Sequence, residues 1–327
     1  MALLGHLLQR LLWALGLLVA VVVLNFLLIQ LAPGDPAEVI AGEMGGATEE
    51  MLAEIRARYG LDQPLPVQLW RYVSRAARGD LGRSLFFDAP VTTLILERMP
   101  ATVLLVLSSL LVSVLVGTWL GVLAARNPRG WLSQSITVLA LVGYSAPVFW
   151  TGILLLLLFA LAIPIFPASG MSDVTRELSA LGRVLDVLHH LVLPTLTLAI
   201  IYLAQYSRLA RASMLEVLGM DYIRTARAKG LAEPTVVYKH ALRNAILPVV
   251  TIAGLQFSQL LSGAVLVETV FNWPGLGRLA FDSILRRDHP VVLGILFCSA
   301  LLVVVANILT DLCYRLVDPR IRVGGAG

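Results

Sequence analysis

The stretch ATVLLVLSSLLVSVLVGTWLGVLA, residues 101–124, decides the fold class. It contains no charged residue, and as one helix rising 1.5 Å per residue it is long enough to cross a hydrocarbon core about 30 Å thick. Five further stretches are similarly apolar: residues 11–31, 136–163, 191–206, 246–267 and 291–312. We therefore expect an all-α polytopic membrane protein with six transmembrane helices.

The composition of the whole chain supports a protein that sits in lipid. Hydrophobic residues make up 58% of the 327 residues and charged residues 14%, whereas soluble domains have about 45–50% and about 25%. So little polar surface cannot cover a soluble globule, which excludes that class of protein. The net charge of +4 is small, and nothing in the chain indicates a nucleic-acid partner.

Arginine and lysine are distributed unevenly between the loops. If the N-terminus is inside, the predicted inner segments, above all residues 208–244, hold most of these residues and the short outer loops hold few. Basic residues near membrane helices favour the cytoplasmic side. We therefore expect both termini to be cytoplasmic.

Residues 32–98, between the first two predicted spans, are expected to form a small extracytoplasmic subdomain. Thr48 can cap a helix whose first turn carries Glu49 and Glu50, and a second helix is expected over residues 67–77. Two interpretations stay open, a structural collar over the helix bundle or a docking surface for a soluble receptor.

Two predicted spans carry small residues at intervals of four, which places them on one helix face and allows close helix contact. The two stripes are Ser109, Ser113, Gly117 and Gly121, and Gly254, Ser258 and Ser262. They fit packing within the bundle or packing against a second membrane subunit.

The loop at residues 208–244 is long for a passive connection and strongly basic. Residues 224–229 suit a short helix, Gly230 suits its C-terminal end, and Pro234 suits the first turn of a following helix. Such a helix–glycine–helix unit can protrude as a knob into a cytoplasmic partner. The alternative is a basic anchor on lipid headgroups.

Several short motifs along the chain carry a resemblance to a known family. They are DYIRTARAKGL (221–231), HALRNA (240–245), LP (247–248), APGDP (32–36), GLDQP (60–64), RGDLG (78–82), PASG (167–170), ETVF (268–271), PGLG (274–277) and DPRIR (318–322). Together they resemble the dipeptide/oligopeptide/nickel permease family of bacterial ATP-binding-cassette (ABC) importers. One departure from the general importer signature is Arg224, which stands where that signature begins with a glutamate.

The resemblance implies the fold of type I ABC importer permeases and a place in the bacterial inner membrane. It also implies an assembly with a second homologous permease, two cytoplasmic ATP-binding subunits and an extracytoplasmic solute-binding protein. Short peptides are the expected substrates, with nickel complexes as the alternative. The expected organisation is a first helix (1–31), the outer subdomain (32–98), a five-helix core (99–316) with the coupling loop (208–244), and a C-terminal tail (317–327).

The chain is expected to be a non-catalytic subunit without a cofactor of its own. A phosphate-binding loop needs glycine directly before its lysine, and the only lysines, Lys229 and Lys239, follow Ala228 and Tyr238. ATP and Mg²⁺ are therefore expected on the partner subunits. By the resemblance, coupling to them falls to Arg224, Thr225, Ala226, Arg227, Ala228, Lys229, Gly230 and Leu231.

Polar residues inside spans tend to face a bundle interior, which makes some of them candidates for the translocation path. The candidates are Tyr144, Ser145, Gln205, Gln256 and Gln259. Hydrogen bonding between helices without substrate contact is the alternative. Pro147, beside the first two candidates, is expected to kink the third span.

An outer gate is expected where the fifth span ends. The candidates are Glu268, Phe271, Pro274 and Gly275. For Glu268 the alternative is a solvated carboxylate at the interface.

Two other classes of function make different demands on the sequence. A secondary transporter would need charged residues in mid-span, and the predicted spans hold none outside their ends. A membrane enzyme or metal site would need a cluster of ligands, and His189-His190 is the only adjacent histidine pair. Neighbouring residues on a helix point about 100° apart, so no metal site is expected there.

Overall fold

The computed structural model describes residues 2–31, 48–59, 62–84, 86–173, 175 and 177–317. Most of these residues are helical, and one isolated antiparallel bridge joins Arg83 and Pro90. The helices are α1 (Ala2–Leu31), α3 (Glu49–Tyr59), α4 (Leu65–Ala77), α5 (Val91–Arg126), α6 (Trp131–Ser145), α7 (Val148–Leu156), η1 (Leu157–Ala162), α8 (Ala180–Leu218), α9 (Asp221–Ala228), α10 (Glu233–Thr235), η2 (Val236–Ala241), α11 (Leu242–Ala245), α12 (Leu247–Val270), α13 (Leu276–Leu285) and α14 (His289–Val317). The motifs at residues 32–36 and 318–322, and Gly60 and Leu61 of a third, lie outside the described residues.

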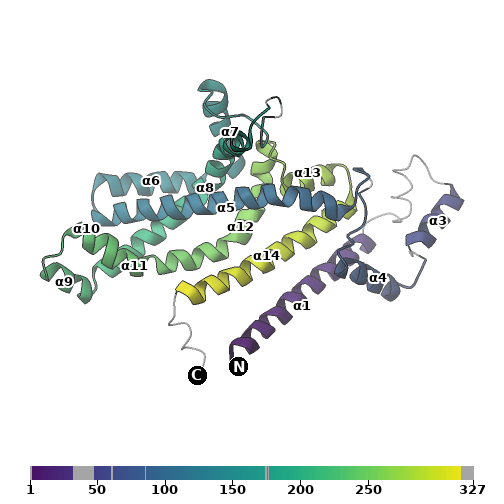
Figure 1. The fold of residues 1–327 in the computed structure, drawn as a ribbon, viewed down its shortest axis with the longest axis horizontal. Coiled ribbons are helices and arrows are strands. Elements are labelled where there is room, and N and C mark those ends of the chain that lie inside the picture. The colour runs from purple at the N-terminus through teal and green to yellow at the C-terminus, as the bar shows by residue number, and fades with distance from the viewer. Residues whose placement is uncertain are drawn as a thin grey trace. The chain divides into compact units, whose positions relative to one another are not determined.

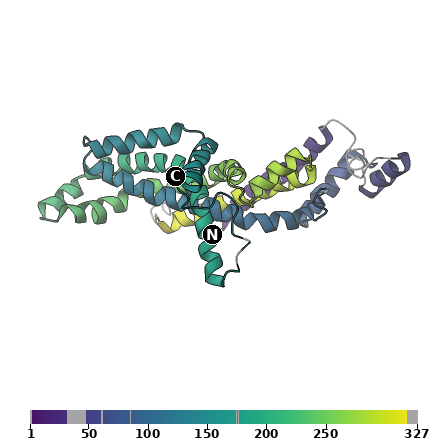
Figure 2. The same cartoon turned by 90° about the horizontal axis from the view of Figure 1, so that it is seen from above.

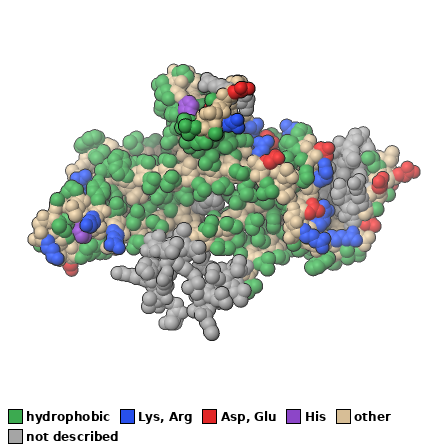
Figure 3. Space-filling model, viewed as in Figure 1, with side chains coloured by type: hydrophobic (Ala, Val, Ile, Leu, Met, Phe, Trp, Pro, Cys, Tyr) green, Lys and Arg blue, Asp and Glu red, His purple; other side chains and the backbone are tan. Residues whose placement is uncertain are grey.

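The chain forms two compact units. One comprises residues 1–99 and 279–305, and the other comprises residues 100–278 and 306–327. In the second unit α6, α7 and α12 pack on the long helix α8 (Figure 1). Its core is apolar and includes Leu105, Leu198 and Tyr206. Hydrophobic side chains also cover the outside of its helices (Figure 3), as expected of a surface that faces lipid.

Three described helices are long and apolar enough to cross a membrane: α5, α8 and α14. They contain the second, fourth and sixth predicted spans and extend beyond them, because the polar residues that flank an apolar stretch continue its helix. Up to five spans result if each of two bent helix pairs counts as one. α1 carries a shorter apolar segment, Leu12–Leu28. The count of six spans stays a prediction.

The third predicted span is broken rather than only kinked. α6 and the α7–η1 pair meet at 106°, and Pro147 lies at the break as the residue before α7. Proline has no backbone N–H, and its ring clashes with the preceding helical turn. The expected effect of Pro147 is therefore confirmed, and the bend that it produces separates two helices.

The stripe of small residues on α5 packs inside the bundle. A Cβ on Gly117 would lie 2.7 Å from Tyr206 Cβ, and one on Gly121 would lie 2.5 Å from the Ser207 carbonyl oxygen. α5 and α8 therefore approach too closely for larger residues. On α12, a Cβ on Gly254 would meet Thr310 of α14. The side chains of Ser258 and Ser262 lie outside the described ones.

Both expected helices of the outer segment are present. α3 begins after Thr48, whose hydroxyl accepts a hydrogen bond from the Met51 amide at 3.3 Å. α4 begins two residues earlier than expected, with Pro66 in its first turn, where a missing N–H costs nothing. Whether residues 32–98 form a subdomain stays a prediction.

Candidate functional site

The loop after α8 folds into a compact unit, which we call the knob and define as residues 221–245 (α9 to α11). α9 begins at Asp221, whose carboxylate suits the positive end of the helix dipole. It ends before Gly230, which has a φ of +77°, a conformation that glycine adopts without steric cost. Pro234 lies in the first turn of α10. Both breaks were predicted from the sequence.

One face of α9 is anchored in a small apolar core. Ile223 and Ala226, three residues apart, point the same way and are buried. They join a cluster from the ends of α5 and α8 and from η2 and α11: Val122, Ala125, Met214, Val217, Val236, Val237, Ala241 and Ala245. Figures 1 and 2 show these elements gathered at the same end of the second unit.

This packing separates the predicted coupling residues into two groups. Ala226 is buried and supports the knob from within, and its role in coupling stays a prediction. The other predicted coupling residues are exposed: Arg224, Thr225, Arg227, Ala228, Lys229, Gly230 and Leu231. Figure 3 shows Lys and Arg side chains at this end of the unit. The exposed face is therefore polar and basic over a rigid apolar base.

An ion pair closes the turn around Gly230. Arg227 donates two hydrogen bonds to Glu233, from Nε to Oε2 at 3.1 Å and from Nη2 to Oε1 at 2.7 Å. These hydrogen bonds hold the pKa of the Glu233 carboxyl below its ordinary value. The bidentate geometry connects the end of α9 to the start of α10 across the turn. Glu233 is not among the predicted coupling residues, although a carboxylate six residues after an arginine, across a predicted turn, is a usable signal.

A second tie joins α9 to the helix that leads back to the bundle. Asn244 Nδ2 donates a hydrogen bond to the Tyr222 hydroxyl at 2.8 Å. Arg224 pairs more loosely with Asp221 at 3.4 Å on the exposed side. This hydrogen bond links α9 to α11, which leads directly into α12.

The polar residues predicted for the translocation path fall into two groups, one with a hydrogen bond between helices and one that is exposed. Gln256 of α12 donates a hydrogen bond to Gln205 of α8 at 2.8 Å, which is the interhelical alternative considered for them. Gln259, Tyr144 and Ser145 are exposed, and the Tyr144 ring lies 5.3 Å from the Arg208 guanidinium. A role of these residues in the path stays a prediction.

Glu268, predicted for an outer gate, is fully buried at 0% exposure. The alternative of a solvated carboxylate is therefore wrong. Its carboxylate accepts hydrogen bonds from the Thr102 hydroxyl at 2.6 Å, from the Arg278 amide at 3.0 Å and from the Gly277 amide. It thus caps the first turn of α13, where backbone amides lack helical partners.

The turn between Glu268 and α13 is tightly enclosed. A Cβ on Gly275 would lie 2.2 Å from a carboxylate oxygen of Glu268. The Trp273 indole donates a hydrogen bond to the Ala101 carbonyl at 2.9 Å, and the Phe271 carbonyl accepts one from the Gly170 amide at 2.9 Å. Phe271 and Gly275 are buried and Pro274 is half-buried. A gating role of this turn stays a prediction.

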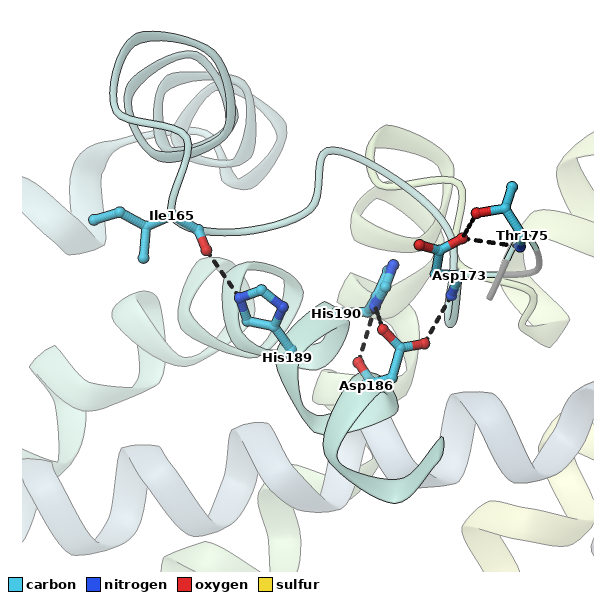
Figure 4. A network of polar contacts seen from close by, with 6 residues as sticks. All are labelled: Ile165, Asp173, Thr175, Asp186, His189 and His190. Carbon is cyan, nitrogen blue, oxygen red and sulfur yellow. Dashed lines mark hydrogen bonds and ion pairs between the residues drawn. The ribbon is translucent and has the colours of Figure 1, made fainter. Parts of the chain in front are cut away.

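The two adjacent histidines are separately engaged (Figure 4). His189 Nε2 lies 2.8 Å from the Ile165 carbonyl, while His190 Nδ1 lies 2.9 Å from the Asp186 carbonyl and 3.3 Å from its carboxylate. The two rings are nearly perpendicular and their centroids are 6.4 Å apart. Among the described residues, no group of three or more His, Cys, Asp or Glu side chains is placed to hold a metal ion.

The chain matches two family models over most of its length. Residues 117–323 match the binding-protein-dependent transport system inner membrane component, and residues 3–106 match the N-terminal part of such membrane components.

Named relatives cover almost the whole chain. A probable peptide ABC transporter permease of Sinorhizobium fredii is 42% identical over 97% of this chain and 99% of its own length. A di/tripeptide transport system permease of Pseudomonas aeruginosa is 42% identical over 94% and 97%. The oligopeptide transport system permease AppB of Bacillus subtilis is 38% identical over 97% and 99%.

The fold also matches a solved structure. A chain of the MetNI methionine ABC transporter, solved in inward-facing conformations, aligns with a TM-score of 0.55 at 17% identity. The alignment covers 69% of this chain and 96% of that one, a likeness that shows a shared fold. The family predicted from the motifs is therefore confirmed, and the chain belongs to the binding-protein-dependent transport system inner membrane components of ABC importers.

Proposed function

We propose that this permease forms half of the transmembrane pathway of an ATP-driven importer of short peptides. Peptides are favoured because the relatives from three genera, each matched over nearly its full length, are named as peptide permeases. The second permease, the two ATP-binding subunits and the solute-binding protein are separate chains. Both termini and the knob lie on the cytoplasmic side, where the basic residues of the loop are favoured.

The knob couples ATP hydrolysis in the partner subunits to the bundle. The observation that carries this role is the two-faced packing of α9, with Ile223 and Ala226 buried and Arg224, Thr225 and Lys229 exposed. A helix seated this way can fit a groove on a partner while its apolar base passes the displacement to α8 and α11. Coupling requires that the partner contacts differ between the two states of the bundle.

The test is reconstitution of the whole transporter in proteoliposomes with labelled peptides as substrates. We expect ATP-dependent uptake of di- or tripeptides that requires the solute-binding protein. Competition with a nickel chelate complex distinguishes the alternative substrate. Uptake of the nickel complex without peptide uptake would replace the peptide assignment, and uptake without ATP-binding subunits would overturn the importer mechanism.

The cytoplasmic role of the knob has a separate test. Thr225→Trp places a bulky side chain on the exposed face of α9, where it meets a partner without disturbing the apolar base. We expect the complex to weaken and uptake to fall, while the thermal stability of the permease itself is unchanged. Normal uptake by this variant, with Ala228→Trp as a second exposed position, would contradict the coupling assignment.

A further inference from the structure

α4 packs on α1 at the end of the apolar segment of that helix. The Tyr72 and Phe26 rings lie 6.1 Å apart, and Gln30 Nε2 donates a hydrogen bond to Gln68 Oε1 at 3.0 Å. The apolar segment of α1 is Leu12–Leu28. α4 therefore lies where a membrane-crossing α1 leaves the hydrocarbon and enters the headgroup region.

The face of α4 that points away from α1 is both aromatic and cationic. Trp70 is two residues from Tyr72, about 200° around the helix, and 71% of it is exposed. Val67 precedes Trp70 by three residues and shares that face, while Arg71 lies about 100° from Trp70 around the helix. Val67 and Arg71 are also exposed. Arg78, directly after the helix, is exposed too.

Arg71 and Arg78 form no ion pair within the described part of the chain. Arg75, by contrast, pairs with Asp80 at 2.8 Å. Guanidinium groups match the geometry of phosphate oxygens. Tryptophan places its apolar ring and its N–H donor at the boundary between lipid chains and headgroups.

We propose that α4 lies in the membrane interface as an amphipathic anchor and binds phospholipid headgroups. Trp70 and Val67 enter the upper part of the acyl region, and Arg71 and Arg78 bind the headgroup phosphates. α1 of the same unit exposes several leucines, including Leu24, Leu27, Leu28 and Leu31. Exposed tryptophan and arginine side chains beside the end of such an apolar helix are the ones that a membrane interface favours, so we assign this face of α4 to lipid and not to a protein partner.

The depth of Trp70 is measured by fluorescence of the full chain in nanodiscs. Subtracting the emission of Trp70→Phe from that of the wild type isolates this residue. The nanodiscs contain phospholipids brominated either near the carbonyl or near the end of the acyl chain. We expect loss of the Trp70 emission with the shallow bromines and a smaller loss with the deep ones. Trp13, exposed at the other end of the same apolar segment, serves as the control through Trp13→Phe and should behave alike.

The headgroup contact is tested by changing the charge of the lipid and the charge of Arg71. With increasing phosphatidylglycerol we expect a blue shift of the Trp70 emission that is lost in Arg71→Glu. Arg83→Glu removes the same charge from a residue that pairs with Asp88 and should leave the shift intact. Trp70 that is unquenched by either brominated lipid overturns the proposal. So does Trp70 that is shielded from aqueous acrylamide only after a soluble solute-binding protein is added, because that result assigns the face to a protein.

Discussion

Two turns of the second unit are held in opposite ways. The turn from Glu268 to Arg278 is built around a buried carboxylate whose hydrogen-bond donors all come from the same chain. The knob rests on an apolar cluster and is closed by the exposed Arg227–Glu233 pair. A buried polar group that loses its hydrogen-bond partner lowers the stability of the fold considerably, whereas an exposed ion pair contributes little to that stability. Substitutions in the Glu268–Arg278 turn should therefore destabilise the protein. In the knob, substitutions in the apolar cluster should be destabilising, while substitutions on the exposed face should be tolerated by the fold.

The largest effect is expected for Glu268→Ala. The change leaves the Thr102 hydroxyl and the Gly277 and Arg278 amides without their acceptor. Each buried unsatisfied group costs about 1–3 kcal/mol, so we expect a loss of several kcal/mol and poor recovery of folded protein. Thermal unfolding in detergent, followed by size-exclusion chromatography, measures this loss.

Glu268→Gln is the matched control, because the amide keeps one acceptor oxygen and the shape of the side chain. It should retain more stability than the alanine variant. Equal stability of wild type and Glu268→Ala would show that the hydrogen bonds of this turn are not what holds it.

The next effect concerns the base of the knob. Ala226→Glu places a carboxylate in the apolar cluster, and a buried unpaired charge is strongly unfavourable. We expect insertion into the membrane to be unaffected, uptake to be lost, and ATP hydrolysis to proceed without transport. Uptake and ATPase activity in proteoliposomes measure the two effects.

Thr225→Glu adds the same charge one residue away, on the exposed face. Its effect is confined to the partner contact, so it should not lower the thermal stability of the permease. Equal losses of thermal stability in Ala226→Glu and Thr225→Glu would show that the buried and exposed faces of α9 do not differ as the structure indicates.

The sequence predicts this knob better than it predicts the Glu268 turn, because the signals for the knob lie in neighbouring residues and the contacts of the turn join residues far apart in the sequence. The break at Gly230 and the position of Pro234 depend on backbone preferences of single residues, which a sequence displays directly. The main partner of Glu268 is Thr102, 166 residues away. No periodicity or spacing indicates such a contact, so the sequence does not predict that Glu268 is buried.

The membrane helices are also predicted only in part from the sequence. Apolar stretches predict which residues lie in membrane helices, because burial in lipid depends on composition. They do not predict where the helices end, since polar residues extend α8 from Ala180 to Leu218. Pro147 indicates a kink, but the 106° angle depends on how α6 and α7 pack on α8.

A smaller effect is expected for the pair that closes the knob. Arg227→Glu and Glu233→Arg each place like charges together at the turn, and the double variant restores an opposite pair. For exposed pairs the coupling is about 0.2–1 kcal/mol, so uptake should fall by up to about fivefold in each single variant. Recovery in the double variant shows that the pair acts by positioning α9. Failure to recover would mean that a partner subunit recognises one of the charges directly.

The smallest effect is the pH dependence of the same pair. Arg227 keeps the pKa of Glu233 below its ordinary value, so the contribution to stability is complete above the ordinary glutamate pKa of about 4.3. It is lost as the pH falls through the lower value of the folded knob, because protonation then removes the charge. Hydrogen exchange of the α9 amides in wild type and Glu233→Gln measures this contribution. The two proteins should differ at pH 6–7 and converge below about pH 4. Convergence already near neutral pH would show that the Arg227–Glu233 pair does not stabilise the knob.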